Sequence, residues 1–280
     1  MAHHQSPQAV TAPTLRVLSL GAGVQSTTLA LLAAAGDIDP MPDCAIFADT
    51  GAEPAAVYSH LDWLEYQLPF PVRRVMAKMG PLGEAVLASY RGDRPRSASP
   101  PFFTSNPDGM LPRQCTKEAK MRPIVAAIRD MLGVAPRARV PAGIVVEQWL
   151  GISTDEAHRM KPAEQDWITN RWPLIEADMS RRACLLWMER AGYPKPVKSA
   201  CVWCPYHDDT AWRTMKAEQP EDFAVAVAFD AAIRNGPPGQ RGEVYLHRSH
   251  QPLDQVDLRT WEQRGQRDLF GEECEGMCGV

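Results

Sequence analysis

The sequence has no uninterrupted apolar run approaching the ~18 residues that a membrane span needs. Its start, MAHHQSPQAVTAPT, lacks the basic and then apolar pattern of a secretory signal peptide. With 30 Lys and Arg against 34 Asp and Glu, the net charge is −4, so no global basic field indicates nucleic acid. We therefore expect a cytoplasmic protein without a membrane partner, and any nucleic-acid partner would need a local basic patch.

What is present suits an enzyme with a substantial core. The chain has 280 residues, of which 45% are hydrophobic and 23% charged, ordinary values for a globular protein. It also has seven cysteines. Without a secretion signal, these favour metal, redox or core roles over a disulfide framework.

Apolar segments alternate with segments of helical spacing in the first half of the chain. Strands are predicted over residues 15–20, 44–48, 72–75 and 144–152, and helices over 26–35, 55–68 and 116–132. This order predicts an α/β fold, a mostly parallel sheet with helices on both faces. Ligands bind such sheets at the carboxyl ends of the strands.

Changes in composition suggest four parts. We expect a disordered leader over 1–14, a nucleotide-binding α/β domain over 15–160, a helical Cys-rich part over 161–265 packed on it, and a flexible Cys-containing tail over 266–280. Within the second part, the Pro-, Ser- and Arg-rich residues 91–113 predict a long irregular loop. This loop either covers a substrate or is a plain insertion.

The stretch SLGAGVQST follows the first predicted strand and opens a helix. No Lys follows the glycines, which excludes the GxxxxGK(S/T) loop. Gly21 and Gly23 fit the start of a GxGxxG dinucleotide fingerprint, but Ser26 stands at the third glycine. Side-chain donors on Gln25 and Ser26 favour an anion at the helix N-terminus. A plain strand-to-helix turn and a Rossmann-type site are the alternatives.

A second stretch, FADTGAEP, follows the next strand, and the two together resemble the PP-loop ATP pyrophosphatase superfamily in its phosphoadenosine phosphosulfate (PAPS) reductase branch. The resemblance implies an adenine nucleotide, ATP or PAPS. Its phosphates would lie against Ser19, Gly21, Gly23, Gln25 and Ser26. Asp49, Thr50, Gly51 and Glu53 match the branch's DTGxE motif, and Asp49 and Glu53 could hold Mg²⁺ or the nucleoside.

A third charged stretch, LGISTDEAHRMKP, follows the last predicted strand. Asp155 is a further candidate for the nucleotide site. Arg159 is a candidate catalytic clamp for phosphate or sulfate, because a guanidinium fork suits tetrahedral oxyanions. The alternative is a solvated helix start.

Four cysteines suggest a metal centre. Cys201 and Cys204 form a CxxC pair, whose thiolates can reach one metal. Iron–sulfur sulfonucleotide reductases resemble this pattern, and Cys115 aligns with the first Cys of their upstream pair. Thr116 replaces the second, so we nominate Cys184 as the fourth ligand of a 4Fe-4S cluster. A buried, apolar Cys184 and a four-cysteine zinc site are the alternatives.

The tail CEGMC carries Cys274 and Cys278. It resembles the mobile ECGxH-type tail of these reductases, although the His is absent. The two thiols are candidate catalytic groups, as a sulfur carrier or redox couple, against an idle tail.

Three functions remain. The favoured one is ATP-dependent sulfur transfer to a nucleobase or nucleic acid, tRNA or DNA, through an adenylated intermediate and with a sulfur donor protein. The second is reduction of PAPS or adenylyl sulfate to sulfite, with a thiol reductant protein. The third is a non-catalytic nucleotide-binding zinc module.

Overall fold

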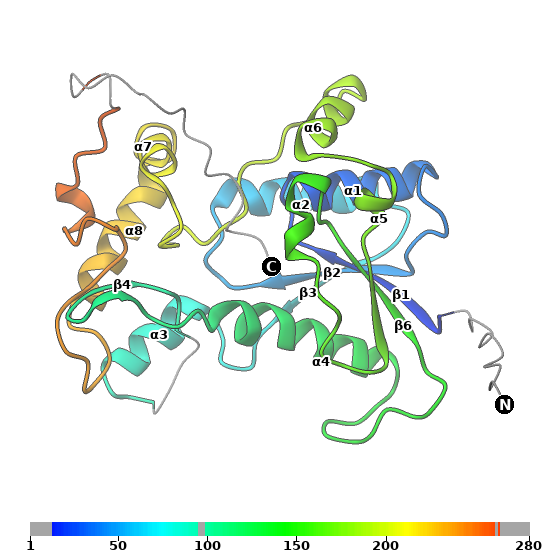
Figure 1. Ribbon diagram of the computed structural model, residues 1–280, viewed down its shortest axis with the longest axis horizontal. Coiled ribbons are helices and arrows are strands. Elements are labelled where there is room, and N and C mark those ends of the chain that lie inside the picture. Colours follow the sequence, from blue (N-terminus) through cyan, green and yellow to red (C-terminus); the bar gives the residue numbers. More distant parts are fainter. Residues whose placement is uncertain (1–12, 95–98, 261–262, 264–280) are drawn as a thin grey trace, which may run out of the picture.

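A five-stranded parallel sheet forms the centre of the computed structural model, which describes residues 13–94, 99–260 and 263 (Figure 1). In spatial order the strands are β3 (Val72–Met76), β2 (Cys44–Asp49), β1 (Leu15–Leu20), β6 (Val146–Leu150) and β7 (Ile168–Arg171). Every neighbouring pair in this order is parallel. The predicted α/β fold with a mostly parallel sheet is confirmed.

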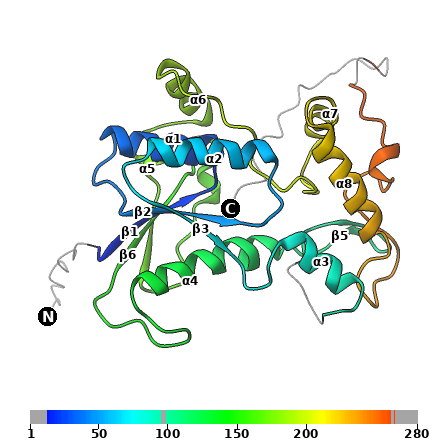
Figure 2. The ribbon, with the colours of Figure 1, turned by 180° about the vertical axis from the view of Figure 1, so that it is seen from behind.

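Helices cover both faces of the sheet, as Figures 1 and 2 show from opposite sides. One face carries α1 (Val24–Ala35), α2 (Ala55–Gln67), α5 (Pro173–Glu176) and α6 (Arg181–Arg190). The other carries α4 (Arg122–Met131), which continues the π-helical segment η1 (Thr116–Met121). Successive strand residues point to opposite faces of the sheet. Leu18 therefore packs in the apolar cluster that includes residues of α1, and Val17 packs in the cluster that includes residues of α4. Burial on both faces explains the continuous apolar strands.

A second lobe lies beside the sheet and has its own apolar core (Figure 1). It comprises α3 (Leu82–Tyr90), β4 (Phe103–Ser105), β5 (Asp108–Met110), α7 (Asp209–Glu218), α8 (Pro220–Ile233), β8 (Val244–Tyr245) and the short helix η3 (Leu253–Gln255). Its core includes the fully buried rings of Phe102 and Trp212. In the described ranges, no helix has the length and apolar character of a membrane span.

The packing divides the chain differently from the predicted boundary at residue 160. Strand β7 and helices α5 and α6 follow that boundary but complete the sheet layer, whereas α3 precedes it and belongs to the second lobe. Residues 91–113, predicted as irregular, contain the β4–β5 hairpin, and β4 also pairs with β8. The division into lobes and the pairing of β4 with β8 depend on contacts between residues far apart in sequence, which local composition does not indicate.

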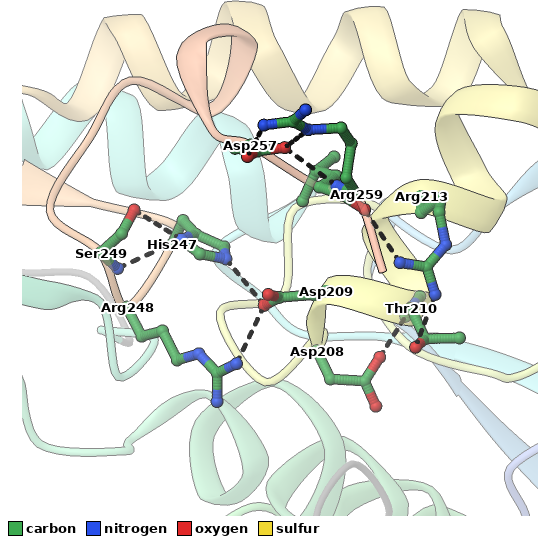
Figure 3. Close-up of polar contacts among 11 residues, drawn as sticks. Asp208, Asp209, Thr210, Arg213, His247, Arg248, Ser249, Asp257 and Arg259 are labelled. Atoms are coloured by element: carbon green, nitrogen blue, oxygen red, sulfur yellow. Dashed lines mark hydrogen bonds and ion pairs between the residues drawn. The ribbon is translucent and has the colours of Figure 1, made fainter. Parts of the chain in front are cut away.

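Polar contacts tie the end of the second lobe to the start of α7 (Figure 3). His247 Nε2 lies 3.2 Å from Asp209 Oδ1, and the Ser249 backbone N–H donates to His247 Nδ1 at 3.1 Å. Arg248 binds the same Asp209 oxygen at 3.1 Å. Burial lowers the pKa of His247, with Asp209 acting in the opposite direction. These contacts hold the chain after β8 against the start of α7.

Candidate functional site

The strand order reverses beside β1, which is where open α/β sheets bind ligands. From β1 the chain proceeds to β2 on one side, and β6 lies on the other. The loop after β1 contains Gly21 and Gly23 and leads into α1, and the segment after β6 begins at Gly151. The predicted nucleotide loop therefore lies at this point of the sheet, and we refer to the place where the two loops meet, at the carboxyl ends of β1 and β6, as the crevice.

Gly151 allows the two loops to approach each other closely. A Cβ atom on this residue would lie 2.9 Å from both Cα and N of Ser26. Real Cβ atoms do not approach backbone so closely, so any side chain here would push the segment after β6 away from α1. Sequence analysis did not single out Gly151. Its signal was a glycine at the end of a buried strand, where a close backbone approach is common.

Ser26 shapes the loop in this structure. Its Oγ accepts a hydrogen bond from the Gly21 N–H at 3.2 Å and donates to the Gly23 carbonyl at 3.3 Å. Between them, Ala22 has φ +55°, in the left-handed region. Gly23 is the N-cap of α1 and supplies no side-chain cap to the helix. The first turn of α1 is thus presented in the manner of helix N-termini that bind anions.

Gln25 links α1 to two other elements. Its Nε2 lies 3.4 Å from Ser153 Oγ and 3.3 Å from Glu156 Oε2, while its Oε1 accepts a hydrogen bond from Arg181 at 2.9 Å. Glu156 in turn pairs with Arg159 at 2.6 Å. The structure therefore brings Gln25 and Arg159, both predicted site residues, into one network. Ser19 lies nearby on β1 and accepts a hydrogen bond from Gln148 at 2.6 Å.

Arg181 is a component of this network that sequence analysis did not identify. It begins α6, and its backbone N–H donates to Asp155 Oδ1 at 3.0 Å. Burial acts to raise the pKa of Asp155, but hydrogen bonds from Ser153 and from the Arg181 backbone outweigh it and leave the pKa below its usual value. The sequence does contain an indication of this role, because Arg181 and Arg182 open a helix whose dipole disfavours cations at that end.

The DTGAE segment forms a tight turn after β2. Asp49 Oδ1 accepts hydrogen bonds from the Gly51 N–H and the Tyr58 hydroxyl, each at 2.7 Å. Gly51 has φ +66°, and a Cβ there would lie 2.9 Å from Pro81 Cβ, so this turn requires glycine. Burial, followed by the hydrogen bond to Asp49, raises the pKa of Tyr58.

Glu53 ends that segment and points toward the cysteines. Only 1% of its side chain is exposed, and it accepts hydrogen bonds from Lys120 at 3.3 Å and Ser199 at 3.0 Å. Burial acts to lower the pKa of Lys120, but Glu53 and then the thiol of Cys201 outweigh it, so the pKa lies above its usual value. Lys120 therefore places a stable positive charge between a carboxylate and a thiol.

Three of the predicted metal ligands, Cys115, Cys201 and Cys204, line one pocket together with Trp203 and Lys120. We refer to it as the cysteine pocket. Cys201 Sγ lies 3.5 Å from the hydroxyl of Thr50 in the DTGAE segment. Burial, and then Glu53, raise the pKa of Cys201 to about 12. Among the described residues, no three His, Cys, Asp or Glu side chains are grouped as the ligands of a single metal ion.

Cys184 is not part of the cysteine pocket. It is fully buried in the apolar cluster between the sheet, α1 and α6, and burial raises its pKa to about 11. Its neighbours there include Leu29 and Met188. Cys184 is thus a buried residue with apolar neighbours, which is the alternative to its role as a metal ligand. Cys274 and Cys278 lie outside the described residues.

Comparison with known proteins found no matching family model and no match among curated proteins. Among solved structures, 22 chains match. One is a PAPS reductase from Candida auris in a phosphate complex, 17% identical, covering 67% of this chain and 77% of that one with a TM-score of 0.42. Another is the U34-tRNA thiolase NcsA from Methanococcus maripaludis with its 4Fe-4S cluster, 12% identical, covering 83% and 76% with a TM-score of 0.38. These similarities concern the fold alone.

Proposed function

We propose that this protein is an enzyme that binds an adenine nucleotide in the crevice and an iron–sulfur cluster in the cysteine pocket, and that it transfers sulfur to an acceptor at the expense of ATP. One observation carries the proposal: the DTGAE segment contacts the cysteine pocket directly and approaches the loop after β1 through Ser199, which donates to Glu53 at 3.0 Å and lies 3.9 Å from the position of a Cβ on Gly23. Thr50 touches Cys201, and the Ala52 carbonyl accepts a hydrogen bond from Val202 at 2.8 Å. A nucleotide bound against this segment would lie next to the thiols.

The donor set suits a cluster, because cysteine thiolates are its usual ligands and three thiols line this pocket. Cys115, Cys201 and Cys204 would hold it, and an iron without a fourth protein thiolate would supply a binding position for sulfide. Lys120 would offset the negative charge of the thiolates. Thiols with raised pKa values release protons when they bind metal.

The proposed reaction has two steps, adenylation of the acceptor and displacement of AMP by sulfur. The acceptor oxygen attacks the α-phosphorus of ATP and forms a bond to it, and pyrophosphate leaves with the electrons of the broken P–O bond. Hydrosulfide then attacks the acceptor carbon, AMP departs with the original oxygen, and the proton of the hydrosulfide is lost to solvent. The amides of α1 and the guanidinium groups of Arg159 and Arg181 would stabilise charge on the phosphates.

A second function, reduction of PAPS to sulfite, shares the crevice. The same two guanidinium groups would bind a sulfate as well as a phosphate. The two functions differ in which nucleotide binds and in what is released. Melting of anaerobically purified protein should therefore be compared with Mg-ATP and with PAPS, because a ligand of the folded state raises the melting temperature.

We expect the larger shift with Mg-ATP, and pyrophosphate release once hydrosulfide and an acceptor are present. A larger shift with PAPS, accompanied by sulfite production, would replace sulfur transfer with the reductase function. No shift with either nucleotide would overturn nucleotide binding in the crevice.

The cluster is tested by two cysteine variants. Cys201→Ser should lose iron, because it removes a thiol from the cysteine pocket. Cys184→Ser is the matched control and should keep iron, since Cys184 lies in a different apolar cluster. Iron and zinc content of both anaerobically purified variants gives the readout, and full iron in Cys201→Ser would exclude this site.

A further inference from the structure

A broad groove lies beside the cysteine pocket, between edge strand β3 and the helix formed by η1 and α4. Its volume is about 1140 Å³, larger than the ~300–1,000 Å³ typical of small-molecule sites. Cationic side chains dominate its lining: Arg73, Arg74, Lys78, Arg113, Lys117 and Arg122, against the carboxylates of Glu118 and Asp130. We call this the basic groove. In a chain of net charge −4, it is a local reversal of sign.

Some of these cations are already paired. Arg74 binds Asp62 and Glu65 on α2, Lys117 binds Glu164 at 2.8 Å, and Arg122 pairs with Glu118. Such exposed pairs reduce the field that these three cations contribute to the groove.

The other three cations have no carboxylate partner among the described residues. Arg73 and Lys78 are exposed and form no ion pair there, and Arg113 lies over the ring of Tyr206 at 5.3 Å. Arg73 lies on β3, Lys78 follows that strand, and Arg113 precedes η1, so these charges come from both sides of the groove. An extended polyanion could therefore contact cations on both walls at once.

Arg113 lines both the basic groove and the cysteine pocket. A chain of phosphates in the groove would thus continue past Arg113 to the thiols. A single nucleotide would not need so long a path, because the crevice at the ends of β1 and β6 already suits it. The volume of the groove, and the three cations on its two walls that have no carboxylate partner within the described ranges, favour a polymer with regularly spaced charges.

We propose that the basic groove binds the sugar–phosphate backbone of a nucleic-acid acceptor and leads it past Arg113 to the cysteine pocket. This inference rests on the proposed function and specifies its acceptor as a nucleic acid. RNA and DNA share the backbone chemistry that the groove recognises. Arginine is suited to this role because its planar fork matches phosphate oxygens.

The test measures binding of two fluorescently labelled probes, bulk tRNA and a single-stranded DNA oligonucleotide, by anisotropy over a range of salt concentrations. The groove variant Arg73→Glu/Lys78→Glu should bind the better probe at least tenfold more weakly. Its salt dependence should be shallower by roughly one to two units of log–log slope, because each lost phosphate contact removes about 0.7–0.9.

The matched control is Arg190→Glu/Lys195→Glu, which reverses one exposed Arg and one exposed Lys at the end of α6 and just beyond it. It has the same net charge as the groove variant and should bind within about twofold of wild type. Equal losses in the two variants would mean that only net charge matters and would overturn the proposal. Unchanged binding by the groove variant would overturn it as well.

Two further measurements separate this proposal from a failure of nucleotide binding and from an acidic protein partner. The groove variant should keep the melting shift caused by Mg-ATP. If that shift is lost, the substitutions have affected the crevice or the fold. The binding comparison is then repeated with the single variants Lys78→Glu and Lys195→Glu. Displacement of the nucleic acid by poly-glutamate at equal charge would indicate an acidic protein partner and overturn the assignment. Tighter binding of tRNA or of DNA identifies the acceptor.

Discussion

The crevice and the cysteine pocket both lie near the DTGAE segment, yet they are built differently. In the crevice, polar side chains already bind one another: both ends of the Gln25 amide are engaged, and Glu156 pairs with Arg159. The cysteine pocket has apolar walls, including Pro100, Pro101 and Trp203, around three thiols. The crevice is thus organised before a ligand arrives, whereas the thiols need a metal or cluster to ionise.

The largest effect should come from breaking the link between the two places. Glu53→Gln removes the carboxylate that pairs with Lys120, and we expect the unfolding free energy to fall by about 2 kcal/mol in urea denaturation. This is less than the roughly 3–5 kcal/mol of a fully buried pair, because 30% of the Lys120 side chain is exposed.

Glu164→Gln is the control for that change. It removes the partner of Lys117 in a pair whose side chains are about half exposed. Such pairs contribute only about 0–1 kcal/mol. Equal losses of unfolding free energy in the two variants would show that the Glu53–Lys120 pair stabilises the fold no more than an exposed ion pair does.

The next effect concerns the approach of the two loops in the crevice. Gly151→Ala places a Cβ 2.9 Å from the Ser26 backbone. We expect a loss of about 1–3 kcal/mol in unfolding free energy and weaker Mg-ATP binding. Gly21→Ala is the matched change, since its Cβ would meet Ser26 Oγ at an ordinary 3.6 Å, and its stability should stay close to that of wild type. The reverse ranking in thermal unfolding would contradict the close approach.

A smaller effect should follow from removing the guanidinium that holds Gln25. Arg181→Met should weaken Mg-ATP binding about tenfold, or ~1.4 kcal/mol, because it frees Gln25 and removes a cation from the crevice. Isothermal titration calorimetry measures it. The neighbouring, exposed Arg182→Met should change the affinity by less than about twofold, and equal effects would deny Arg181 its specific role.

The smallest effect is the contribution of His60 to the pH dependence of stability, which adds to those of the buried His207 and His247. Burial lowers the pKa of His60, whose Nε2 lies 3.1 Å from Thr27 Oγ1 on α1. The unfolded chain then binds a proton more readily than the folded one, so stability is complete above about pH 6.5 and falls as the pH drops below it. His60→Gln should flatten this decline in urea denaturation series. An unchanged slope would exclude His60 as its source.

Much of the fold could be predicted because local spacing reports local structure. The strand at 15–20 was predicted with its observed limits, and the helix predicted over 116–132 is present as η1 followed by α4. The hairpin within residues 91–113 was missed, because its strands are three residues long and β4 depends on β8 for a second partner.

The candidate site was predicted to a smaller extent. The segment containing Ser26 and the one containing Glu53 were found, because they follow adjacent strands and carry polar groups at strand ends. Arg181 was missed, since its contact with Gln25 spans 156 positions. Cys184 has the same residue type as the pocket cysteines, so its position in another cluster could not be read from its identity.

Local sequence patterns specify the alternation of strands and helices, the two glycine-bearing loops and the CxxC pair. These features depend on residues close together in the chain, whose spacing the sequence displays directly. Three relations arise from tertiary packing alone: Glu53 meets Lys120 beside the cysteine pocket, Gly151 lets two loops approach, and cations from β3 and η1 share one groove. Those relations depend on the order of strands in the sheet, which brings distant segments together and which no local pattern specifies.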